Sequence, residues 1–592
     1  MLSILLTLPA LGVGWMGDDF WHRAVLLRPA GLEEVSLLRP RSDLDLFRFL
    51  DGDPGRGRLG MDLGLLPWWS WPGIRGAFWR PLTSLTHWLD HRLWPGSAVL
   101  MHAHSVVWLA AVSAAASLLY RRVMGATVAA GLAALLYAAD DARGMPVGFL
   151  ANRNALIAAF FCVLTILAHL RWRRDGWRPG ALLAPALLAL SLLSAEAGVA
   201  TLAYLVAFAA FLDRGRWIWR TASLVPYVVQ TVLWRLAWKA MGYGISPGID
   251  FYVDPAAEPW RFLVAVLERG PVLLLDQWAL PPSELYLILE GGYLAALWTA
   301  AVVFLSLCAA VIVPRLRDDA AARFWALGML LAVVPSCSAF PSGRLLLFVG
   351  LGAFGLVGQF LSPQAASAEG VGRSPSARVL AVILVTVHAV FSPLFLLWRS
   401  ANPTGPKRMM NSFYVRLPAD ESVRDQDVVV LNPPMAMFAG FVLPMRALEG
   451  LPLPRHVRVL GPSLQAVDLT RLDERRLLLR SRDGYLRYAF DQLFRPRHRP
   501  FAPGDRVELT GMTAEITSLT PDGRPAEVTF RFAVPLEDPS LRWLRWDDAS
   551  GRFVTFTPPP VGQTMKLSSG ALMGLGGLSD SQPQPARREG GP

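Results

Sequence analysis

Long apolar segments separated by short polar loops fill the first 400 residues of this chain of 592 residues. A helix that crosses a bilayer needs about 20 mainly apolar residues. Eleven segments approach that length and predict membrane-spanning helices: 2–16, 97–120, 123–139, 155–170, 180–194, 197–212, 221–243, 285–313, 323–340, 345–361 and 378–398. The segment 260–280 carries Glu268, Arg269 and Asp276 among its apolar residues, so we expect an interfacial or re-entrant helix there instead of a crossing.

Two segments at the start of this membrane domain, 1–400, need a separate interpretation. Residues 1–16 lack the basic start and the small-residue cleavage site of a signal peptide, so we interpret them as a retained first helix. The loop 17–96 is long, and Trp68-Trp69-Ser70-Trp71 and Phe78–Leu82 are typical of helices that lie in the membrane interface.

The pattern changes near residue 400, where polar residues, proline and arginine become frequent. Short runs rich in β-branched and apolar residues predict strands separated by turns such as Pro521-Asp522-Gly523. These runs are Val428–Leu431, Arg506–Leu509 and Glu527–Val534. We therefore expect residues 401–567 to form a β-rich extracytoplasmic domain. The last stretch, 568–592, is rich in Gly, Ser, Pro and Gln and predicts a disordered tail. The fold class is thus mostly α, a polytopic helix bundle with a C-terminal β-rich domain.

Composition agrees with an integral membrane protein. Hydrophobic residues make up 53% and charged residues 17%, whereas a soluble domain carries about 25% charge. The net charge of +11 comes mainly from arginines in short loops and in the C-terminal part, which favours membrane topology and anionic headgroups over nucleic acid as the explanation. Cys162, Cys308 and Cys337 all lie in apolar segments, so neither a disulfide framework nor a thiolate metal site is indicated. We expect no metal site and no cofactor.

Basic residues occur on every second loop: Arg121-Arg122, Arg171–Arg174, Asp213–Arg220 and Arg315–Arg317. The positive-inside rule makes these loops cytoplasmic. The remaining loops, which carry the acidic pairs, would then share the extracytoplasmic side. This predicts a multi-pass protein of the cell (inner) membrane with the loop 17–96 and the β-rich domain outside.

Two adjacent carboxylates, in Gly17-Asp18-Asp19-Phe20, directly follow the first apolar segment. An ionised carboxylate at a bilayer edge is costly unless it has a partner or a function. A half-dry site raises the pKa of a carboxyl group, which suits a general base for transfer to a hydroxyl. The alternative is that both residues cap or solubilise a helix end.

Other charged groups on the same predicted side form candidate binding residues. Arg80 and Arg344 are able to hold a lipid phosphate, although headgroup-facing arginines are common. Asp140 and Asp141, together with Arg143 and Arg153, suit a sugar phosphate or form a self-neutralising loop. Further candidates are His102, which follows Arg80 along the chain, and Glu196, which lies either in a functional site or in a tight interfacial turn.

Six short motifs occur in order along residues 1–400: Asp18-Asp19, Arg80-Pro81-Leu82-Thr83, Met101-His102-Ala103-His104, Leu150–Leu156, Leu193-Ser194-Ala195-Glu196 and Gly343–Phe348. Together they resemble the GT-C superfamily of polytopic glycosyltransferases, and most of all the O-mannosyltransferase-like enzymes, including the tetratricopeptide-bearing transmembrane type. The chain departs from those relatives at Ala139–Arg143, where they carry His-Pro-x-His-x-Glu. Ala195 replaces a lysine, Gly343 replaces a glutamate, and a β domain takes the place of the repeats.

The resemblance implies an enzyme that transfers a hexose or pentose, with inversion, from a polyprenyl-phosphate donor to a protein, glycan or lipid hydroxyl. Asp19 or Asp18 would be the catalytic base, and we prefer Asp19 because it lies further from the helix end. Arg80 and Arg344 would bind the leaving phosphate, and Asp140 or Asp141 the sugar or acceptor. His102, Arg153 and Glu196 would complete the substrate site.

Two other interpretations remain open. One is a transferase that uses another lipid-linked donor, such as a pentose or aminosugar, to modify lipid A or glycans. The other is a non-catalytic or degenerate membrane scaffold, or a transporter, that displays the β domain. A transporter more often carries charges or broken helices in mid-span, whereas the charges of this chain cluster at one predicted face.

Overall fold

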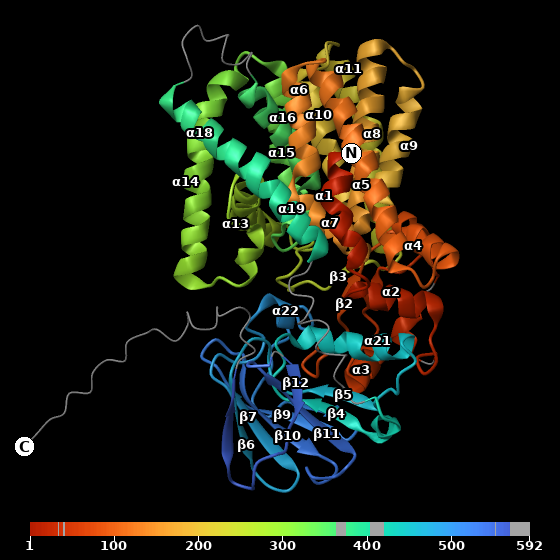
Figure 1. Cartoon of the computed structure of the whole chain (residues 1–592), viewed down its shortest axis with the longest axis vertical. Coiled ribbons are helices and arrows are strands. Elements are labelled where there is room, and N and C mark those ends of the chain that lie inside the picture. The colour runs from red at the N-terminus through yellow and green to blue at the C-terminus, as the bar shows by residue number, and fades with distance from the viewer. Residues whose placement is uncertain (34, 40–41, 363–373, 403–418, 551, 569–592) are drawn as a thin grey trace, which may run out of the picture. The chain divides into compact units, whose positions relative to one another are not determined.

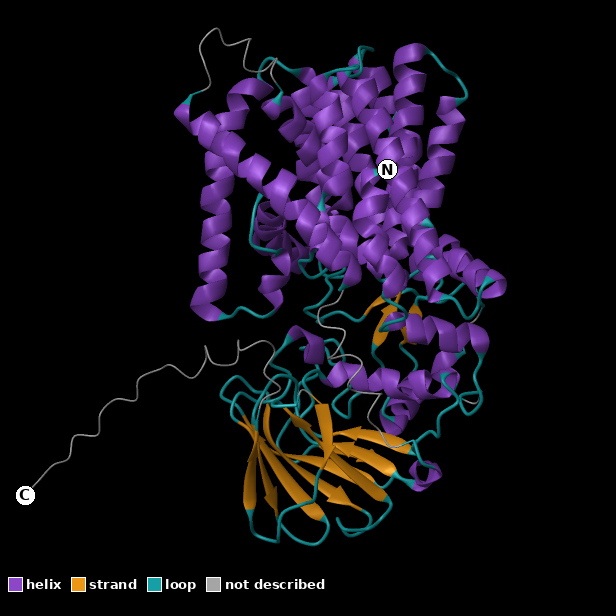
Figure 2. Cartoon of the chain, in the orientation of Figure 1, coloured by secondary structure: helices purple, strands orange, loops and turns teal. Residues whose placement is uncertain are grey.

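The structure is a computed structural model that describes residues 1–592 except 34, 40–41, 363–373, 403–418, 551 and 569–592. The chain divides into two compact units. The first comprises Met1–Asp53 and Gly73–Lys407, and the second comprises Pro54–Pro72 and Arg408–Pro592. Helices build the first unit, and most of the strands belong to the second (Figure 2). Apart from Ser568, the predicted tail lies outside the described residues.

The first unit is a bundle of apolar helices (Figure 1). Its α-helices are α1 Leu2–Thr7, α2 Asp18–Leu27, α4 Pro81–Leu93, α5 Ala98–Met124, α6 Val128–Ala139, α7 Gly144–Gly148, α8 Arg153–Asp175, α9 Gly180–Leu192, α10 Thr201–Phe211, α11 Trp217–Ala222, α12 Val225–Ala240, α13 Pro259–Trp278, α14 Gly291–Leu316, α15 Ala320–Ser336, α16 Leu347–Leu361, α18 Pro375–Val385 and α19 Ser392–Ala401. Short 3-10 turns join several of them: η1 Leu8–Gly12, η2 Ser36–Leu38, η3 Asp141–Arg143, η4 Leu150–Asn152, η5 Glu196–Ala200, η6 Ser283–Leu287 and η7 Gly343–Leu346. A π-helical stretch, η8 Thr386–Phe391, links α18 to α19.

Five helical segments within the described residues are long and apolar enough to cross a membrane. They are Ala98–Met124, Leu150–Asp175, Gly291–Pro314, Gly343–Leu361 and Pro375–Ala401. The chain is therefore a multi-pass membrane protein by length and composition. Each of the eleven predicted segments contains a helix, but most of the others are short; the first one, for example, ends at Gly12. Eleven crossings thus remain a prediction. The segment 260–280 does form a helix, α13.

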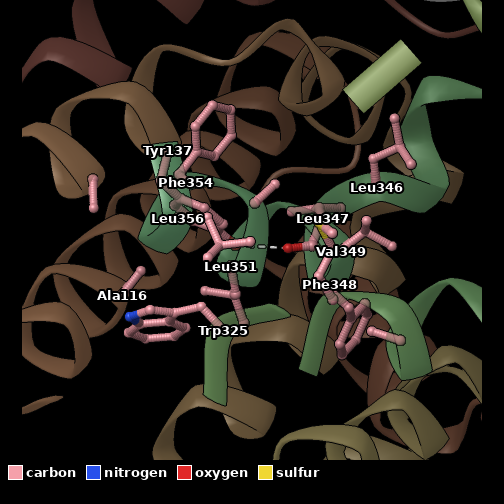
Figure 3. Close-up of a cluster of buried hydrophobic side chains, with 14 of the residues drawn as sticks. Ala116, Tyr137, Trp325, Leu346, Leu347, Phe348, Val349, Leu351, Phe354 and Leu356 are labelled. Carbon is pink, nitrogen blue, oxygen red and sulfur yellow. Dashed lines mark hydrogen bonds between the residues drawn. The ribbon is translucent and has the colours of Figure 1, made fainter. Parts of the chain in front are cut away.

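Helix α16 lies at the centre of the bundle and is buried on nearly all sides. A helix that is apolar all round, as this one is, belongs in an interior. Its residues pack with Tyr137 of α6 and Trp325 of α15 (Figure 3). Glycines allow this close approach: a Cβ at Gly352 would lie 2.4 Å from the Trp325 carbonyl oxygen, and one at Gly358 would lie 2.5 Å from that of Ala129. Small residues at such contacts are typical of helix packing in membranes.

The described residues of the second unit form two sheets. A six-stranded antiparallel sheet has the order β13-β6-β7-β10-β9-β8, and a four-stranded mixed sheet has the order β12-β11-β4-β5. The strands are β4 Asp427–Val430, β5 His456–Val459, β6 Val467–Arg471, β7 Arg476–Ser481, β8 Arg506–Leu509, β9 Met512–Leu519, β10 Pro525–Phe532, β11 Leu541–Asp547, β12 Arg552–Thr555 and β13 Thr564–Leu567. The helical elements of this unit are α3 Pro54–Leu63, η9 Glu421–Asp425, η10 Ala436–Phe441, α21 Val442–Leu448 and α22 Ala489–Gln492. The first unit adds a small antiparallel sheet of β1 Arg48–Asp51, β2 Arg75–Ala77 and β3 Gly244–Ile245.

The segment Pro54–Pro72 differs from its sequence interpretation. Its tryptophans predict helices at a membrane interface, yet residues 64–72 are not helical and pack inside the β-rich unit. Trp69 is fully buried and donates a hydrogen bond to the Asp491 carbonyl oxygen at 3.3 Å. Trp68 packs edge-on against Tyr485 and Phe530. Tryptophan is an amphipathic side chain that suits a membrane interface and a protein core equally well, so composition alone does not separate the two.

Candidate functional site

Asp18 and Asp19 begin helix α2, directly after Gly17. Gly17 has a φ of +47°, a left-handed conformation that glycine adopts without a steric penalty. This turn lets the chain leave the first apolar helical segment and start a new helix at once. Carboxylates in the first turn also complement the helix dipole. Local geometry therefore explains why two acidic residues are tolerated here, but not what each side chain does.

The Asp19 side chain forms hydrogen bonds with two other segments of the backbone. It is 3% exposed. One carboxylate oxygen accepts a hydrogen bond from the Ala151 N–H at 2.8 Å, and the other accepts one from the Met16 N–H at 3.1 Å. Burial raises its pKa to about 8 even though both N–H groups favour the charged form. Asp19 thus joins the start of α2 to the turn before α8, and little of it is available to a substrate.

Asp18 has a different environment. It is half-buried, and its carboxylate has no hydrogen-bond or ion-pair partner in the part of the chain that the structure describes. Burial raises its pKa to about 6, while the positive charges of Arg344 and Arg80 oppose that rise. A carboxylate with this pKa is mainly ionised at neutral pH and is able to accept a proton from a hydroxyl group.

Arg344 forms fewer contacts with other protein groups than Arg80 does. It lies in η7, and its guanidinium stacks over the Phe340 ring at 4.8 Å. Its Nε is buried without a hydrogen-bond partner, and no ion pair joins it to another described residue. Arg80, the N-cap residue of α4, is paired with Glu196 at 2.8 Å and stacks over Phe78 at 4.5 Å. The structure therefore associates Asp18, Arg344 and Arg80 electrostatically, and Glu196 joins them through Arg80.

A network of ionisable groups holds the loop that carries Arg344. The carboxylate of Glu284 accepts hydrogen bonds from the Gly343 N–H at 2.8 Å and from the Ser342 hydroxyl at 2.9 Å. Arg399, on α19, pairs with Glu284 at 3.3 Å and with Asp141 at 3.3 Å. A Cβ at residue 343 would lie 2.5 Å from Nη1 of Arg399, so only glycine fits there without displacement.

Asp276 adds a third carboxyl group to this network. It accepts a hydrogen bond from Ser283 at 2.7 Å. Burial, followed by the negative charges of Glu284 and Asp141, raises its pKa to about 8. Burial also raises the pKa of Asp141. Sequence reasoning did not identify Glu284, Arg399 or Asp276 as site residues. Their positions near the ends of apolar segments were the only sequence signal.

Asp140 and Asp141 both interact with other groups of the protein, and their expected role in substrate binding stays a prediction. Asp140 forms an ion pair with the fully buried Arg143. Ser392 of α19 donates a hydrogen bond to Asp141 at 2.9 Å and contacts Asp140 at 3.4 Å. These contacts agree with the self-neutralising loop, which is the alternative interpretation, and they connect the loop to helix α19.

Arg153 and His102 also take part in internal contacts. Arg153 is fully buried, pairs with Asp90 at 2.5 Å and donates to the Met101 carbonyl oxygen at 2.6 Å. His104 contacts the other oxygen of Asp90 at 2.7 Å. The two ring nitrogens of His102 lie 2.9 Å from the Gly14 carbonyl oxygen and 3.1 Å from that of Val147. We call Asp90, Arg153 and His104 the closed network. Asp90 was not among the predicted residues.

The donor set around Asp18 does not indicate a metal centre. Within the described residues, no group of three or more His, Cys, Asp or Glu side chains is arranged to hold a metal ion.

Comparisons with known proteins give weak structural similarities. No protein-family model matches the sequence, and no curated protein matches it. The chain is similar to the crystal structure of the apo oligosaccharyltransferase of Archaeoglobus fulgidus, with a TM-score of 0.42 and 14% identity over 78% of this chain and 64% of that chain. It is also similar to the oligosaccharyltransferase AglB of that archaeon in complex with an inhibitory peptide and a dolichol-phosphate, with a TM-score of 0.39 and 14% identity over 77% and 64%. This chain thus spans slightly less than two thirds of each of these proteins.

Proposed function

We propose that this chain is a GT-C-like membrane glycosyltransferase that moves a sugar from a polyprenyl-phosphate donor to a hydroxyl group, with inversion at the anomeric carbon. The observation that carries the proposal is the unpartnered carboxylate of Asp18, whose pKa the positive charges of Arg344 and Arg80 lower. A half-buried base next to an unpaired cation matches a reaction that removes a proton from one reactant and releases a phosphate from the other.

In the proposed reaction, Asp18 takes the proton of the acceptor hydroxyl. The hydroxyl oxygen attacks the anomeric carbon while the bond from that carbon to the phosphate oxygen breaks. Polyprenyl phosphate leaves with the bonding electron pair, and Arg344 stabilises its negative charge. Arg80 contributes less, because Glu196 already neutralises part of its charge.

We assign the base to Asp18 in place of Asp19. Both oxygens of Asp19 accept backbone hydrogen bonds, and its side chain is only 3% exposed, so an acceptor hydroxyl has little access to it. Asp140, Asp141 and Arg153 then act indirectly, by positioning α19 and by supporting the helix starts. Glu284 positions the loop of Arg344.

A second candidate function is a membrane scaffold without catalysis. It is favoured by one observation, namely that most of the expected substrate-binding groups are bound to protein partners. Asp140 pairs with Arg143, Arg153 with Asp90, and Arg80 with Glu196. Under this interpretation the unpartnered Asp18 would have no chemical consequence.

Transfer assays separate these two functions. Purified protein in detergent is incubated with synthetic farnesyl phosphate-linked mannose, a pentose and an N-acetylaminosugar, each with a panel of peptide, glycan and lipid acceptors. Release of farnesyl phosphate with an inverted glycosidic bond in the product, seen by NMR, supports the enzyme. Arg344→Lys should raise the donor KM, because lysine does not copy bidentate phosphate contacts. A scaffold would release no farnesyl phosphate from any donor.

The orientation in the membrane is part of the same proposal. The alternation of arginine-rich loops supports an extracytoplasmic location for residues 17–96 and 401–592. Reporter fusions at Arg122 and Pro500 should then show opposite sides of the membrane. The same side for both fusions would overturn this topology.

A further inference from the structure

The second unit contains a cleft of 680 Å³ that the proposed transfer reaction does not use. One wall comes from α3 and the Ser70-Trp71-Pro72 turn. The other comes from all four residues of β8 together with Arg495 and Phe501. Both walls belong to the same compact unit. The volume lies within the range of ligand-binding clefts, about 300–1,000 Å³.

Strand β8 is the end strand of the six-stranded sheet. It pairs with β9 on one side, from Arg506 opposite Glu515 to Leu509 opposite Met512. Its other edge forms no strand pairing with the described residues, and this strand lines the cleft along its whole length. An unpaired edge presents a row of N–H and C=O groups that is complementary to another extended chain.

The opposite wall contains one buried polar group without a hydrogen-bond partner among the described residues. Ser70 is 1% exposed, and its hydroxyl has no hydrogen-bond partner although the residue lines the cleft. A buried hydroxyl in that state is costly, and a ligand that bonds to it relieves the cost. This wall approaches β8 at Thr510, whose N–H and hydroxyl are both bound by the Asp62 carboxylate at 2.6 Å and 2.8 Å.

Two arginines in the cleft form no ion pair with the described residues, although Asp505 acts on the charge of Arg495. Arg58 is exposed and forms no ion pair. Arg495 stacks over the Phe501 ring at 3.4 Å and donates hydrogen bonds to carbonyl oxygens, including that of Trp69 at 3.2 Å. Burial lowers its pKa to about 10, so it remains a cation at neutral pH. Three carboxylates also line the cleft, but Asp62 and Asp505 accept hydrogen bonds from the N–H groups of Thr510 and Ala502, and Glu508 is exposed on β8. Arg58 and Arg495 therefore remain as cations without an ion pair among the described residues, and they favour a ligand with a carboxylate.

We propose that this cleft binds an extended peptide segment, which adds to the free edge of β8 as a further strand and places an acidic side chain near Arg58 and Arg495. An edge strand supplies main-chain affinity, and the neighbouring side chains supply selectivity, as in other cases of strand addition. A saccharide would use the arginines and Trp71 but would leave the row of backbone groups on β8 unused. The proposal is independent of the transferase assignment.

The test uses the full-length protein in detergent and a fluorescein-labelled peptide of about eight residues that alternates threonine with glutamate, long enough to cover a typical strand. Fluorescence anisotropy should show saturable binding. A peptide with the same side chains but N-methyl groups at alternate residues should bind at least about tenfold more weakly, because several main-chain hydrogen bonds of about 1 kcal/mol each are lost. A lysine-for-glutamate peptide should also bind more weakly.

Two charge-reversal variants, one in the cleft and one outside it, test whether the peptide binds in this cleft. Arg58→Glu should weaken the binding of the glutamate peptide and strengthen that of the lysine peptide. Arg531→Glu, at an exposed position of β10, should change the affinity for neither peptide. Equal affinity for the N-methylated and unmodified peptides would overturn strand addition. No saturable binding up to about 1 mM, the weak limit of specific recognition, would overturn the peptide site.

Discussion

The candidate site of Asp18 and Arg344 and the closed network of Asp90, Arg153 and His104 each contain a carboxylate and a guanidinium, yet they differ in how these groups are paired. In the closed network, every charged group has a partner: Asp90 and Arg153 are both fully buried and lie 2.5 Å apart. In the candidate site, Asp18 and Arg344 attract one another but neither has an ion-pair partner among the described residues. The two charges of a buried ion pair neutralise each other, whereas a carboxylate and a guanidinium without ion-pair partners remain available to other charged groups.

Under the proposed function, pairing in the folded chain, and not the presence of a motif, distinguishes the reactive carboxylate from the structural one. We therefore expect mutations in the two regions to have opposite effects on activity and stability. Mutations at Asp18 and Arg344 should change activity with little effect on stability. Mutations in the closed network should act mainly on stability. The predictions below test this contrast.

The largest expected effect is on catalysis at Asp18. Asp18→Asn keeps the size of the side chain but removes the base, so kcat should fall by about 10²- to 10⁴-fold. Thermal unfolding should remain unchanged, because the Asp18 side chain forms no hydrogen bond with the described residues. Transfer to the acceptor, normalised to folded protein, measures the first quantity. Wild-type kcat in this variant, with Asp19→Asn inactive, would restore Asp19 as the base.

The second effect is on stability at Asp90. Asp90→Asn leaves the fully buried Arg153 without its counter-charge, which should cost about 3–5 kcal/mol. Thermal or denaturant unfolding in detergent measures this loss. Glu196→Gln serves as the control: it removes a carboxylate from the pair with Arg80, which is partly exposed, and should cost about 1 kcal/mol or less. Equal losses for the two variants would contradict the expected difference between a fully buried and a partly exposed ion pair.

The third effect separates the adjacent aspartates. Asp19→Ala leaves the N–H groups of Met16 and Ala151 without an acceptor, which should cost about 1–3 kcal/mol. Asp18→Ala breaks no hydrogen bond and should leave the free energy of unfolding almost unchanged. The two alanine variants have the same composition and differ by one position, so each is the matched control of the other.

Much of the local structure could be predicted from the sequence. The strand expected at Arg506–Leu509 is observed with the same bounds, and the turn Pro521-Asp522-Gly523 joins β9 to β10 with a positive φ at Gly523. These elements depend on neighbouring residues: alternation of side chains defines the strand, and glycine permits the turn. The apolar segments likewise contain helices at the expected places.

The candidate site could be predicted only in part. Asp18, Arg80 and Arg344 were identified from short motifs. The preference for Asp19 over Asp18 could not be decided locally, because the partner that occupies Asp19 is the Ala151 N–H, 132 positions away along the chain. Glu284 and Arg399 were missed for the same reason, since they pair across 115 positions and belong to no motif. Contacts of this kind depend on the packed bundle.

The smallest effect concerns the pH dependence of the proposed base. Since Asp18 must be ionised to accept a proton, transfer should decline as the pH falls through its pKa of about 6. The positive charge of Arg344 lowers that pKa, so Arg344→Gln should raise it and move the acid limb of kcat to higher pH. The shift should be less than about one pH unit, because partly exposed charges interact by about 1 kcal/mol. Arg121→Gln, at an exposed position on α5, should leave the limb in place. If the acid limb moves to lower pH in Arg344→Gln, the titrating group is not stabilised in its charged form by this arginine. Asp18 and Arg344 would then not be the reacting centre.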